Sequence, residues 1–340
     1  MIMTAIHDAY KLGQSIWLDY ISKDLIASGG IQDWIDKGVV GVTTNPSIFE
    51  NAIAKTTDYD EEIASLRKKG KSTAEIYEVL TVQEVGAAAD ILRPVYDKTG
   101  GKDGYVSLEV NPLLASDRDT TISEAKRLFA LLNRPNVMIK IPATPEGIEA
   151  LTECIASNVN VNSTLIFSRA QYESVARAYI EGTKRGGKAA SVASVFVSRV
   201  DGAVDKLVPA ELQGKIAVAG IKMMYQAFKK LFAGAEQVQR PLWASTGTKN
   251  KAYSDVKYVE ELIGPDTVNT VPPATLNAFV EHGKAALTLE AGIAEAEAVL
   301  AKCDVNLPEV CAKLLADGLE AFNGAFRSLM SAIETKGAKL

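Results

Sequence analysis

The chain has 340 residues, with 37 Lys and Arg against 42 Asp and Glu, so its formal net charge is −5. Hydrophobic residues make up 47% and charged residues 23%, which excludes an intrinsically disordered chain. The net charge gives no general attraction to nucleic acid or to an anionic membrane, and neither partner is expected. The length suits one large domain, and α/β barrels reach this size as one unit.

The rare residue types exclude several kinds of site. Cys154, Cys303 and Cys311 are too few and too scattered for a disulfide framework. With only His7 and His282, we expect neither a bound zinc ion nor a Ser-His-Asp triad. No basic-then-apolar leader opens the chain, and no stretch approaches eighteen uncharged apolar residues. These features predict a cytoplasmic setting.

Short apolar runs rich in strand-forming residues alternate with longer amphipathic stretches. In chain order, we expect strands over residues 15–20, 39–44, 105–110, 137–143, 159–167, 190–197, 241–245 and 267–271. Apolar residues at three- and four-residue spacing predict helices over 60–67, 74–96, 121–132, 147–157, 169–183, 215–232 and 253–263. The C-terminal part, 276–300 and 309–335, is expected to be helical throughout.

Strands that alternate with helices pair in parallel, and about eight such units predict a closed (β/α)8 TIM barrel of α/β class. An open doubly wound sheet is the alternative, although no GxGxxG follows any strand. We expect a single domain over residues 1–340, with extra helices at about 276–340. These helices either cover the barrel mouth or form a dimer contact.

A barrel places its catalytic residues at the C-terminal ends of its strands. Asp19, Glu109 and Lys140 are each the single charge in a predicted strand, between apolar neighbours. Because side chains alternate between the two faces of a strand, these charges point into the barrel while their neighbours pack under the helices. An isolated buried charge is very costly, so the three groups need one another, solvent or a chemical role.

For each charge alone, a structural ion pair is the simpler interpretation. Together, one lysine and two carboxylates on three strands favour Schiff-base chemistry on a ketone. Burial of Lys140 is expected to lower its pKa and supply the neutral amine that attacks a carbonyl. The two carboxylates can then move protons during dehydration and carbon–carbon cleavage. Lys222, near the start of a predicted helix, is the rival lysine, and we expect it to be solvated or to pack.

Uncharged polar residues occupy matching strand ends. Asn45 ends the second predicted strand, Asn162 and Thr164 lie in the fifth, and Ser194 lies in the sixth. Each residue alone is also typical of a turn or of a satisfied strand end. As a set, they could bind the hydroxyls of a polyol substrate.

Basic residues and hydroxyls follow the next two strands. Arg199 follows the sixth strand, and Ser245 and Lys249 follow the seventh. Small residues, hydroxyls and a cation at the start of such a loop suit a phosphate group. The alternative is a surface ion pair between Arg199 and Asp201 or Asp205.

Several of these segments resemble transaldolase. GVTTNPSIF, residues 41–49, resembles the family's first motif, and VMIKIPATPEGIEA, residues 137–150, resembles the motif around its Schiff-base lysine. VSLEVNP, NSTLIFS and ASVFVSR resemble three further segments, and WLDY and WAST are similar to a bacterial subfamily. The resemblance implies a class I aldolase-type barrel without metal or organic cofactor. It implies transfer of a dihydroxyacetone unit from sedoheptulose 7-phosphate to glyceraldehyde 3-phosphate in the pentose phosphate pathway, and it favours a homodimer.

The resemblance also implies roles for the catalytic residues. Lys140 matches the Schiff-base lysine and Asp19 the general acid/base for cleavage. Glu109 matches the carboxylate that moves protons through a water near Thr164.

The implied phosphate site departs from the family in one position. Members carry an arginine two residues after the serine that matches Ser245, whereas here the loop reads ASTGTKN and the nearest basic residue is Lys249. A lysine offers a point charge in place of a bidentate fork. The implied binding residues are Asn45 and Asn162 for the dihydroxyacetone hydroxyls, Ser194 and Phe196 on the sixth strand, and Arg199 and Ser245 for the phosphate.

Two alternatives to a transaldolase stay open. A fructose-6-phosphate aldolase of the same superfamily would release free dihydroxyacetone, but the resemblance places a tyrosine at position 109 in such enzymes. A non-catalytic barrel would be expected to have lost at least one of Asp19, Glu109 and Lys140.

Overall fold

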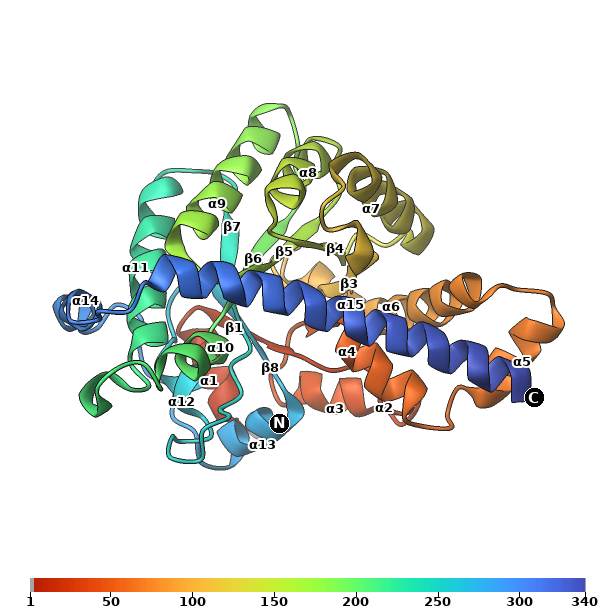
Figure 1. The fold of residues 1–340 in the computed structure, drawn as a ribbon, viewed down its shortest axis with the longest axis horizontal. Helices are drawn as coiled ribbons and strands as arrows, with labels where there is room; N and C mark the ends of the chain where they lie inside the picture. Colours follow the sequence, from red (N-terminus) through yellow and green to blue (C-terminus); the bar gives the residue numbers. More distant parts are fainter. Residues whose placement is uncertain (1–2, 340) are drawn as a thin grey trace.

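The computed structural model describes residues 3–339, and over this part eight parallel strands close into one barrel (Figure 1). Each strand pairs with the next one in the chain, and β8 pairs with β1. The strands are β1 (Gln14–Leu18), β2 (Val42–Thr43), β3 (Val106–Glu109), β4 (Val137–Pro142), β5 (Val161–Ile166), β6 (Ser191–Phe196), β7 (Gln239–Ala244) and β8 (Thr267–Val271). The predicted TIM barrel is confirmed.

The second strand is much shorter than the predicted 39–44. Its end is set by Asn45, whose side chain accepts a hydrogen bond from the backbone of Ile48 and thereby begins the next helix. Before its start, Val40 donates to the carbonyl of Ile16 and Gly41 accepts from Leu18, and a Cβ atom on Gly41 would lie 2.6 Å from the ring of Trp17. The first two strands therefore approach each other closely before β2 begins.

Helices surround the strands and cap the barrel. They are α1 (Ala5–Lys11), α2 (Lys23–Ala27), α3 (Gly30–Asp36), α4 (Pro46–Phe49), α5 (Asp60–Lys68), α6 (Thr73–Lys98), α7 (Arg118–Leu132), α8 (Pro145–Ala156), α9 (Arg169–Lys184), α10 (Ser198–Val204), α11 (Ile216–Leu231), α12 (Lys257–Glu260), α13 (Pro273–His282), α14 (Ile293–Ala301) and α15 (Leu307–Lys339). Short π- and 3₁₀-helices cover Glu50–Ala54, Pro112–Leu114 and Ala210–Leu212. Over residues 3–339, no helix is both long and apolar enough to cross a membrane.

The prediction of continuous helix over 276–300 is wrong. Residues 283–292 separate α13 from α14 and adopt no helix. The backbone N–H groups of Thr288 and Leu289 donate to the carbonyl of Ile263, at 3.1 Å each, in place of helical partners. The Leu289 side chain is fully buried. The predicted helix 253–263 shrinks to the four residues of α12.

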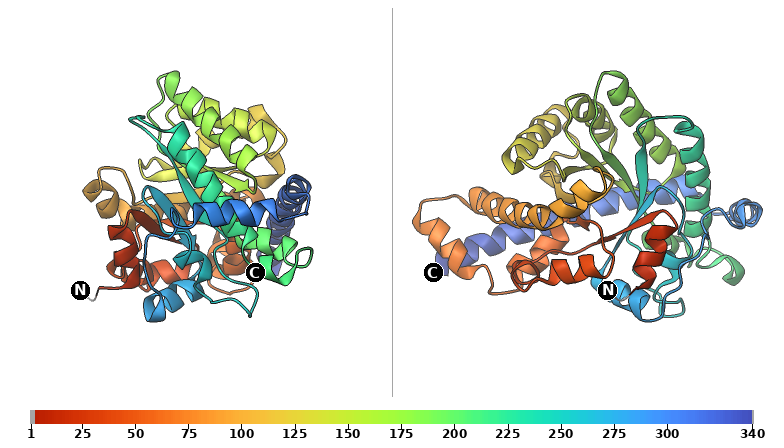
Figure 2. Two further views of the ribbon diagram at one scale, coloured as in Figure 1. Left: turned by 90° about the vertical axis from the view of Figure 1, so that its left-hand side faces the viewer. Right: turned by 180° about the vertical axis from the view of Figure 1, so that it is seen from behind.

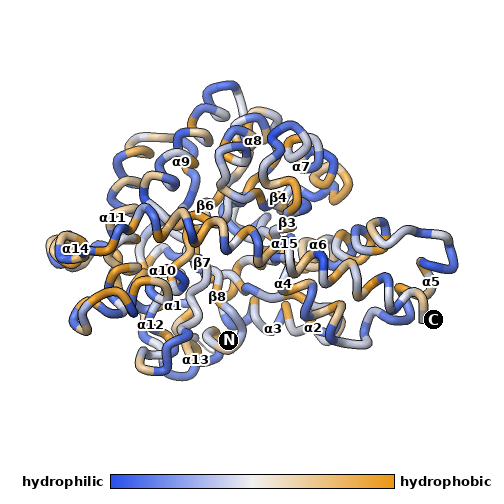
Figure 3. Tube along the Cα trace, viewed as in Figure 1, coloured by the Kyte–Doolittle hydropathy of each residue, from blue (hydrophilic) through white to orange (hydrophobic). Residues whose placement is uncertain are grey.

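The C-terminal helix α15 lies across the barrel mouth (Figure 1). It contacts α4, α10 and the 3₁₀-helix Pro112–Leu114, which follow three different strands. Its far end packs beside α5 and α6 on one side of the barrel (Figure 2). Hydrophilic and hydrophobic segments alternate along it, as expected of a helix with one buried face (Figure 3). Of the two predicted positions for this helix, the structure shows the cover over the mouth.

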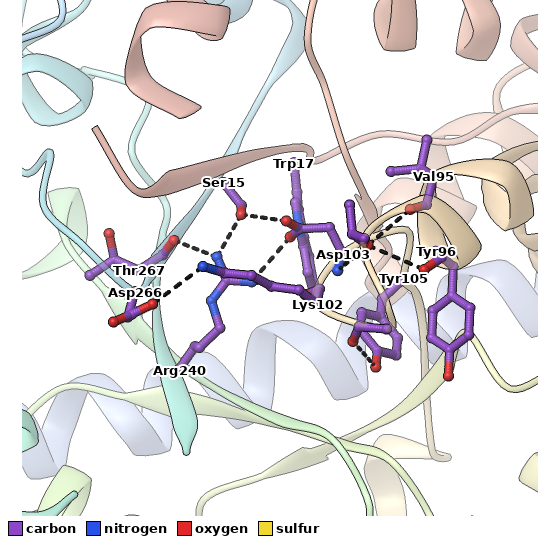
Figure 4. A network of polar contacts seen from close by, with 12 residues as sticks. Ser15, Trp17, Val95, Tyr96, Lys102, Asp103, Tyr105, Arg240, Asp266 and Thr267 are labelled. Atoms are coloured by element: carbon purple, nitrogen blue, oxygen red, sulfur yellow. Dashed lines mark hydrogen bonds and ion pairs between the residues drawn. The ribbon is translucent and has the colours of Figure 1, made fainter. Parts of the chain in front are cut away.

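A buried ion pair closes the opposite end of the barrel (Figure 4). Arg240 and Asp103 lie 3.1 Å apart, with side chains 8% and 0% exposed. Asp103 also accepts hydrogen bonds from Ser15 and Trp17, and Arg240 donates to the carbonyl of Thr267. Since Ser15 and Arg240 lie at the starts of β1 and β7, this network holds the N-terminal ends of the strands together. In a barrel, that end serves stability and the mouth serves chemistry.

Candidate active site

The barrel brings the three predicted charges together at its mouth. Asp19 directly follows β1, Glu109 ends β3, and Lys140 lies in β4 opposite Glu109 in the strand ladder. Glu109 Oε2 lies 3.7 Å from Lys140 Nζ, and the two side chains are only 4% and 6% exposed. The apolar strand neighbours Leu108 and Ile139 are buried. The alternation expected from the sequence is confirmed.

Neighbouring groups fix the direction of these side chains. Lys140 Nζ donates a 3.0 Å hydrogen bond to the carbonyl of Thr44, and it lies 5.8 Å from the ring centroid of Phe322 on α15. The Thr43 hydroxyl donates to Asp19 Oδ1 at 2.8 Å. The lysine amine is therefore held at the mouth beneath the C-terminal helix, with a positioned carboxyl nearby.

Burial makes both carboxyl groups weaker acids than usual. Burial raises the pKa of Asp19, while the Lys140 charge and the Thr43 hydrogen bond act in the opposite direction. Burial raises the pKa of Glu109 to about 7, again against the attraction of Lys140. A carboxyl such as Glu109, whose pKa lies close to neutral pH, is suited to general acid and base catalysis.

Lys140 and Asp19 line a polar cavity of about 160 Å³. This volume suits a small polar substrate or part of a larger one. The other residues predicted from the sequence that line it are Asn45, Ser194, Phe196, Arg199 and Ser245.

Asn162 and Thr164 extend the site along β5. Asn162 lies opposite Lys140 in the ladder, accepts a 2.6 Å hydrogen bond from Ser194 and donates to Ser107 at 3.1 Å. The buried Thr164 hydroxyl and both carboxylate oxygens of Glu109 have no hydrogen-bond partner in the protein. Buried polar atoms without a protein partner are expected to bind water or a ligand.

Of the predicted phosphate-binding residues, Arg199 and Ser245 line the cavity, whereas Lys249 does not. Arg199 lies half-buried 5.2 Å from the ring centroid of Phe196, and burial lowers its pKa. Ser245 has a left-handed backbone (φ 56°), and its hydroxyl lies 2.9 Å from that of Ser198. Lys249 is largely exposed, and partial burial together with the Arg199 charge lowers its pKa. Two cations that repel each other favour an anion between them.

The alternative ion pair of Arg199 is wrong. Asp201 accepts hydrogen bonds from the Tyr258 hydroxyl and from a backbone N–H. Asp205 accepts from the Tyr253 hydroxyl and also from a backbone N–H. Within residues 3–339, neither carboxylate forms an ion pair with Arg199, so its charge stays available to a ligand.

Five further residues line the cavity and were missed from the sequence: Thr43, Ser47, Ala244, Thr270 and Phe322. Thr43 and Ser47 flank Asn45 in the 41–49 motif, so the motif itself could have indicated them. Phe322 lies more than 180 residues from Lys140 in the sequence, and no local pattern links the two.

The rival lysine takes no part in this site. Lys222 lies on α11, and its amine donates a 2.6 Å hydrogen bond to the carbonyl of Ala291, in the segment before α14. As expected, Lys222 is not among the residues that line the polar cavity.

A larger cavity of about 610 Å³ lies between α8, α9, α11 and the start of α15. Its lining is largely apolar, and its arginine, Arg169, forms an ion pair with Glu173. Phe196 borders both cavities. Since the larger cavity holds no acid or amine that could act on a substrate, the smaller polar cavity is the candidate active site.

Comparisons with known proteins identify the family of this chain. The family model "Transaldolase/Fructose-6-phosphate aldolase" matches residues 16–333. A "Transaldolase 1" of Streptomyces avermitilis is 46% identical, over 95% of this chain and 93% of its own length. A "Transaldolase" of Trichodesmium erythraeum is 42% identical over 100% and 99%, and one of Neisseria meningitidis is 43% identical over 97% and 99%. The chain therefore belongs to the transaldolase/fructose-6-phosphate aldolase family.

Proposed function

We propose that the protein is a transaldolase that works through a Schiff base on Lys140. It would transfer a dihydroxyacetone unit from sedoheptulose 7-phosphate to glyceraldehyde 3-phosphate, giving erythrose 4-phosphate and fructose 6-phosphate. The observation that carries the proposal is the buried Lys140 amine, 3.7 Å from the Glu109 carboxyl and beside Asp19 in one cavity. Family membership and the names of the relatives support the same activity.

The first step joins the enzyme to the ketose. The neutral Lys140 amine attacks the C2 carbonyl and forms a carbinolamine. Glu109, whose pKa of about 7 lets it carry a proton, protonates the departing hydroxyl, which leaves as water. The Thr164 hydroxyl, without a partner in the protein, is placed to bind that water. The product of this step is a protonated imine at C2.

The second step breaks and remakes a carbon–carbon bond. Asp19 takes the proton of the C4 hydroxyl, and the C3–C4 electron pair moves into the protonated imine. The aldose phosphate leaves, and a three-carbon enamine stays bound to Lys140. An acceptor aldose then adds at C3, Asp19 returns the proton, and hydrolysis with Glu109 releases the new ketose. Burial, which raises the pKa of Asp19, helps it to hold the proton between these events.

The surrounding polar groups would hold the substrate. The side-chain oxygen of Asn45 accepts the capping hydrogen bond at the start of α4, so its amide NH₂ group is free to donate to a substrate hydroxyl. We assign Asn162 and Ser194 to the dihydroxyacetone hydroxyls and Phe196 to the wall of the cavity. The proposed phosphate ligands are Arg199, Ser245 and Lys249.

The transfer reaction and the simple aldolase reaction can be separated by one assay. The protein is incubated with sedoheptulose 7-phosphate, with and without glyceraldehyde 3-phosphate, while erythrose 4-phosphate and free dihydroxyacetone are measured. A transaldolase releases multiple equivalents of erythrose 4-phosphate only with the acceptor. Free dihydroxyacetone that is released without the acceptor as fast as with it would instead assign an aldolase. Lys140→Ala should abolish either activity, whereas the control Lys222→Ala should retain it.

Several features beyond the reaction remain part of this proposal. We expect the protein to act in the cytoplasm on the pentose phosphate pathway, as a single barrel domain and as a homodimer. Light scattering at micromolar concentration tests the homodimer, because a monomer has half the mass.

A further inference from the structure

A second cavity, of about 180 Å³, reaches Glu109 from outside the barrel. Glu109 lines its inner part, while half-exposed Arg127 and exposed Ala74 line its outer part. Arg127 is held there by ion pairs with Glu78 and, at 2.8 Å, with Glu124. The cavity therefore runs from a charged rim at the surface to a catalytic carboxyl at the mouth.

The C-terminal helix keeps the two cavities apart. Phe322 lines the substrate cavity, and Phe326 and Met330 line the second cavity. These residues follow at intervals of four, so they lie on one face of α15. Glu109 lines the second cavity, and Lys140, whose Nζ lies 3.7 Å from Glu109 Oε2, lines the substrate cavity, so this pair stands between the two cavities.

One hydroxyl group of the second cavity belongs to Tyr77 on α6. Its ring packs edge-on against Phe326, with centroids 5.3 Å apart and planes at 89°. Burial, and then the negative charges of Glu109, Glu124 and Glu78, raise the pKa of Tyr77. Its hydroxyl therefore stays protonated and can donate a hydrogen bond next to Glu109, whose oxygens have no partner in the protein.

We propose that the second cavity is the water path of the lysine chemistry, and that Tyr77 is a positioning residue that holds a water against Glu109. The inference rests on the proposed function. Imine formation releases one water and imine hydrolysis consumes one. A bound ketose fills the substrate cavity, and Phe322 covers Lys140, so water exchanges from the other side of Glu109. At about 30 Å³ per molecule, the second cavity has room for a short chain of waters.

The proton balance follows the same path. When the carbinolamine C2–O bond breaks, the hydroxyl takes the Glu109 proton and leaves as water, and Glu109 becomes a carboxylate. When a water from the second cavity adds to the imine carbon, Glu109 takes one of its protons. The cycle returns Glu109 to its starting state, and Tyr77 only donates a hydrogen bond.

Two variants test separately whether the Tyr77 hydroxyl positions a water and whether water passes through the second cavity. Tyr77→Phe keeps the ring against Phe326 and removes the hydroxyl. Ala74→Phe narrows the rim without touching the catalytic residues, and Ala130→Phe places the same side chain on an exposed site of α7 outside the cavity. If Ala74→Phe does not fold, as judged by circular dichroism, Ala74→Met replaces it.

The measurement follows two rates with fructose 6-phosphate. Borohydride quenching gives the rate of imine formation, and loss of ¹⁸O from the C2 carbonyl into ordinary water gives the rate of oxygen exchange above the enzyme-free background. Tyr77→Phe should slow imine formation about tenfold, the value of one lost hydrogen bond, with KM changed less than twofold. Ala74→Phe should form imine at the normal rate but lose ¹⁸O several-fold more slowly, because the same water is returned.

Other outcomes would overturn the inference. Equal rates of ¹⁸O loss in Ala74→Phe and Ala130→Phe would contradict the water path. A normal rate of imine formation in Tyr77→Phe would contradict the positioning role of Tyr77. No trapped imine in the unmodified protein would instead contradict the proposed function itself.

Discussion

Replacing Glu109 by glutamine should inactivate the protein and make it more stable above neutral pH. Glutamine keeps the shape of the side chain but cannot carry the charge whose burial raises the pKa of Glu109 to about 7, against 4.5 for an ordinary glutamate. Because the folded state holds this proton more tightly than the unfolded state, Glu109 makes the protein less stable as pH rises from about 4.5 to 7. At about 1.4 kcal/mol per pKa unit, the loss reaches about 3 kcal/mol above pH 7. Glu109→Gln removes that loss.

The assay is urea unfolding of the unmodified protein and Glu109→Gln at pH 5 and at pH 8. The difference in unfolding free energy should be small at pH 5 and grow to about 3 kcal/mol in favour of the variant at pH 8. Glu297→Gln, which alters an exposed carboxylate on α14, is the control and should show no such growth. Equal stability differences at the two pH values would refute the assignment of a proton to buried Glu109 near neutral pH.

Three further predictions concern the ion pair at the N-terminal ends of the strands, the phosphate site and the cleavage step. Asp103→Ala leaves buried Arg240 unpaired and should lower the unfolding free energy by about 3–5 kcal/mol in urea, whereas a loss below about 1 kcal/mol would mean that the pair is not structural. Arg199→Gln should raise KM for sedoheptulose 7-phosphate roughly 10- to 100-fold and leave turnover of unphosphorylated fructose unchanged, while exposed Lys249→Gln should have a smaller effect. With fructose 6-phosphate, Asp19→Asn should still form the imine but not cleave the C3–C4 bond, so borohydride should trap the whole six-carbon ketose on the enzyme. A three-carbon adduct would assign the cleavage base to another residue.

Local patterns were sufficient to predict the barrel and its central charges. The strands alternate in a period of two, so a lone charge such as Lys140 between two isoleucines must face inward, where the structure places it beside Glu109. The parallel order of the strands follows from the helices between them. The proximity of these groups at the mouth therefore required no information beyond the sequence.

Features that depend on distant contacts could not be predicted in the same way. Phe322 reaches Lys140 only because α15 crosses the mouth, and a helical pattern does not say what its apolar face covers. Arg240 was left outside the predicted strand 241–245, so its pairing with Asp103 was missed. Residues 283–292 are rich in helix-forming residues but bond to Ile263 instead, which shows tertiary contacts overriding local propensity.

The most direct test of the central claim is to locate the covalent intermediate. The protein is incubated with fructose 6-phosphate, reduced with borohydride, digested and mapped by peptide mass spectrometry. The proposed mechanism predicts one adduct of the size of reduced dihydroxyacetone on Lys140, since the three-carbon fragment stays bound until an acceptor arrives. An adduct on Lys222, or no adduct on a folded protein, would contradict the assignment of Lys140 as the nucleophile.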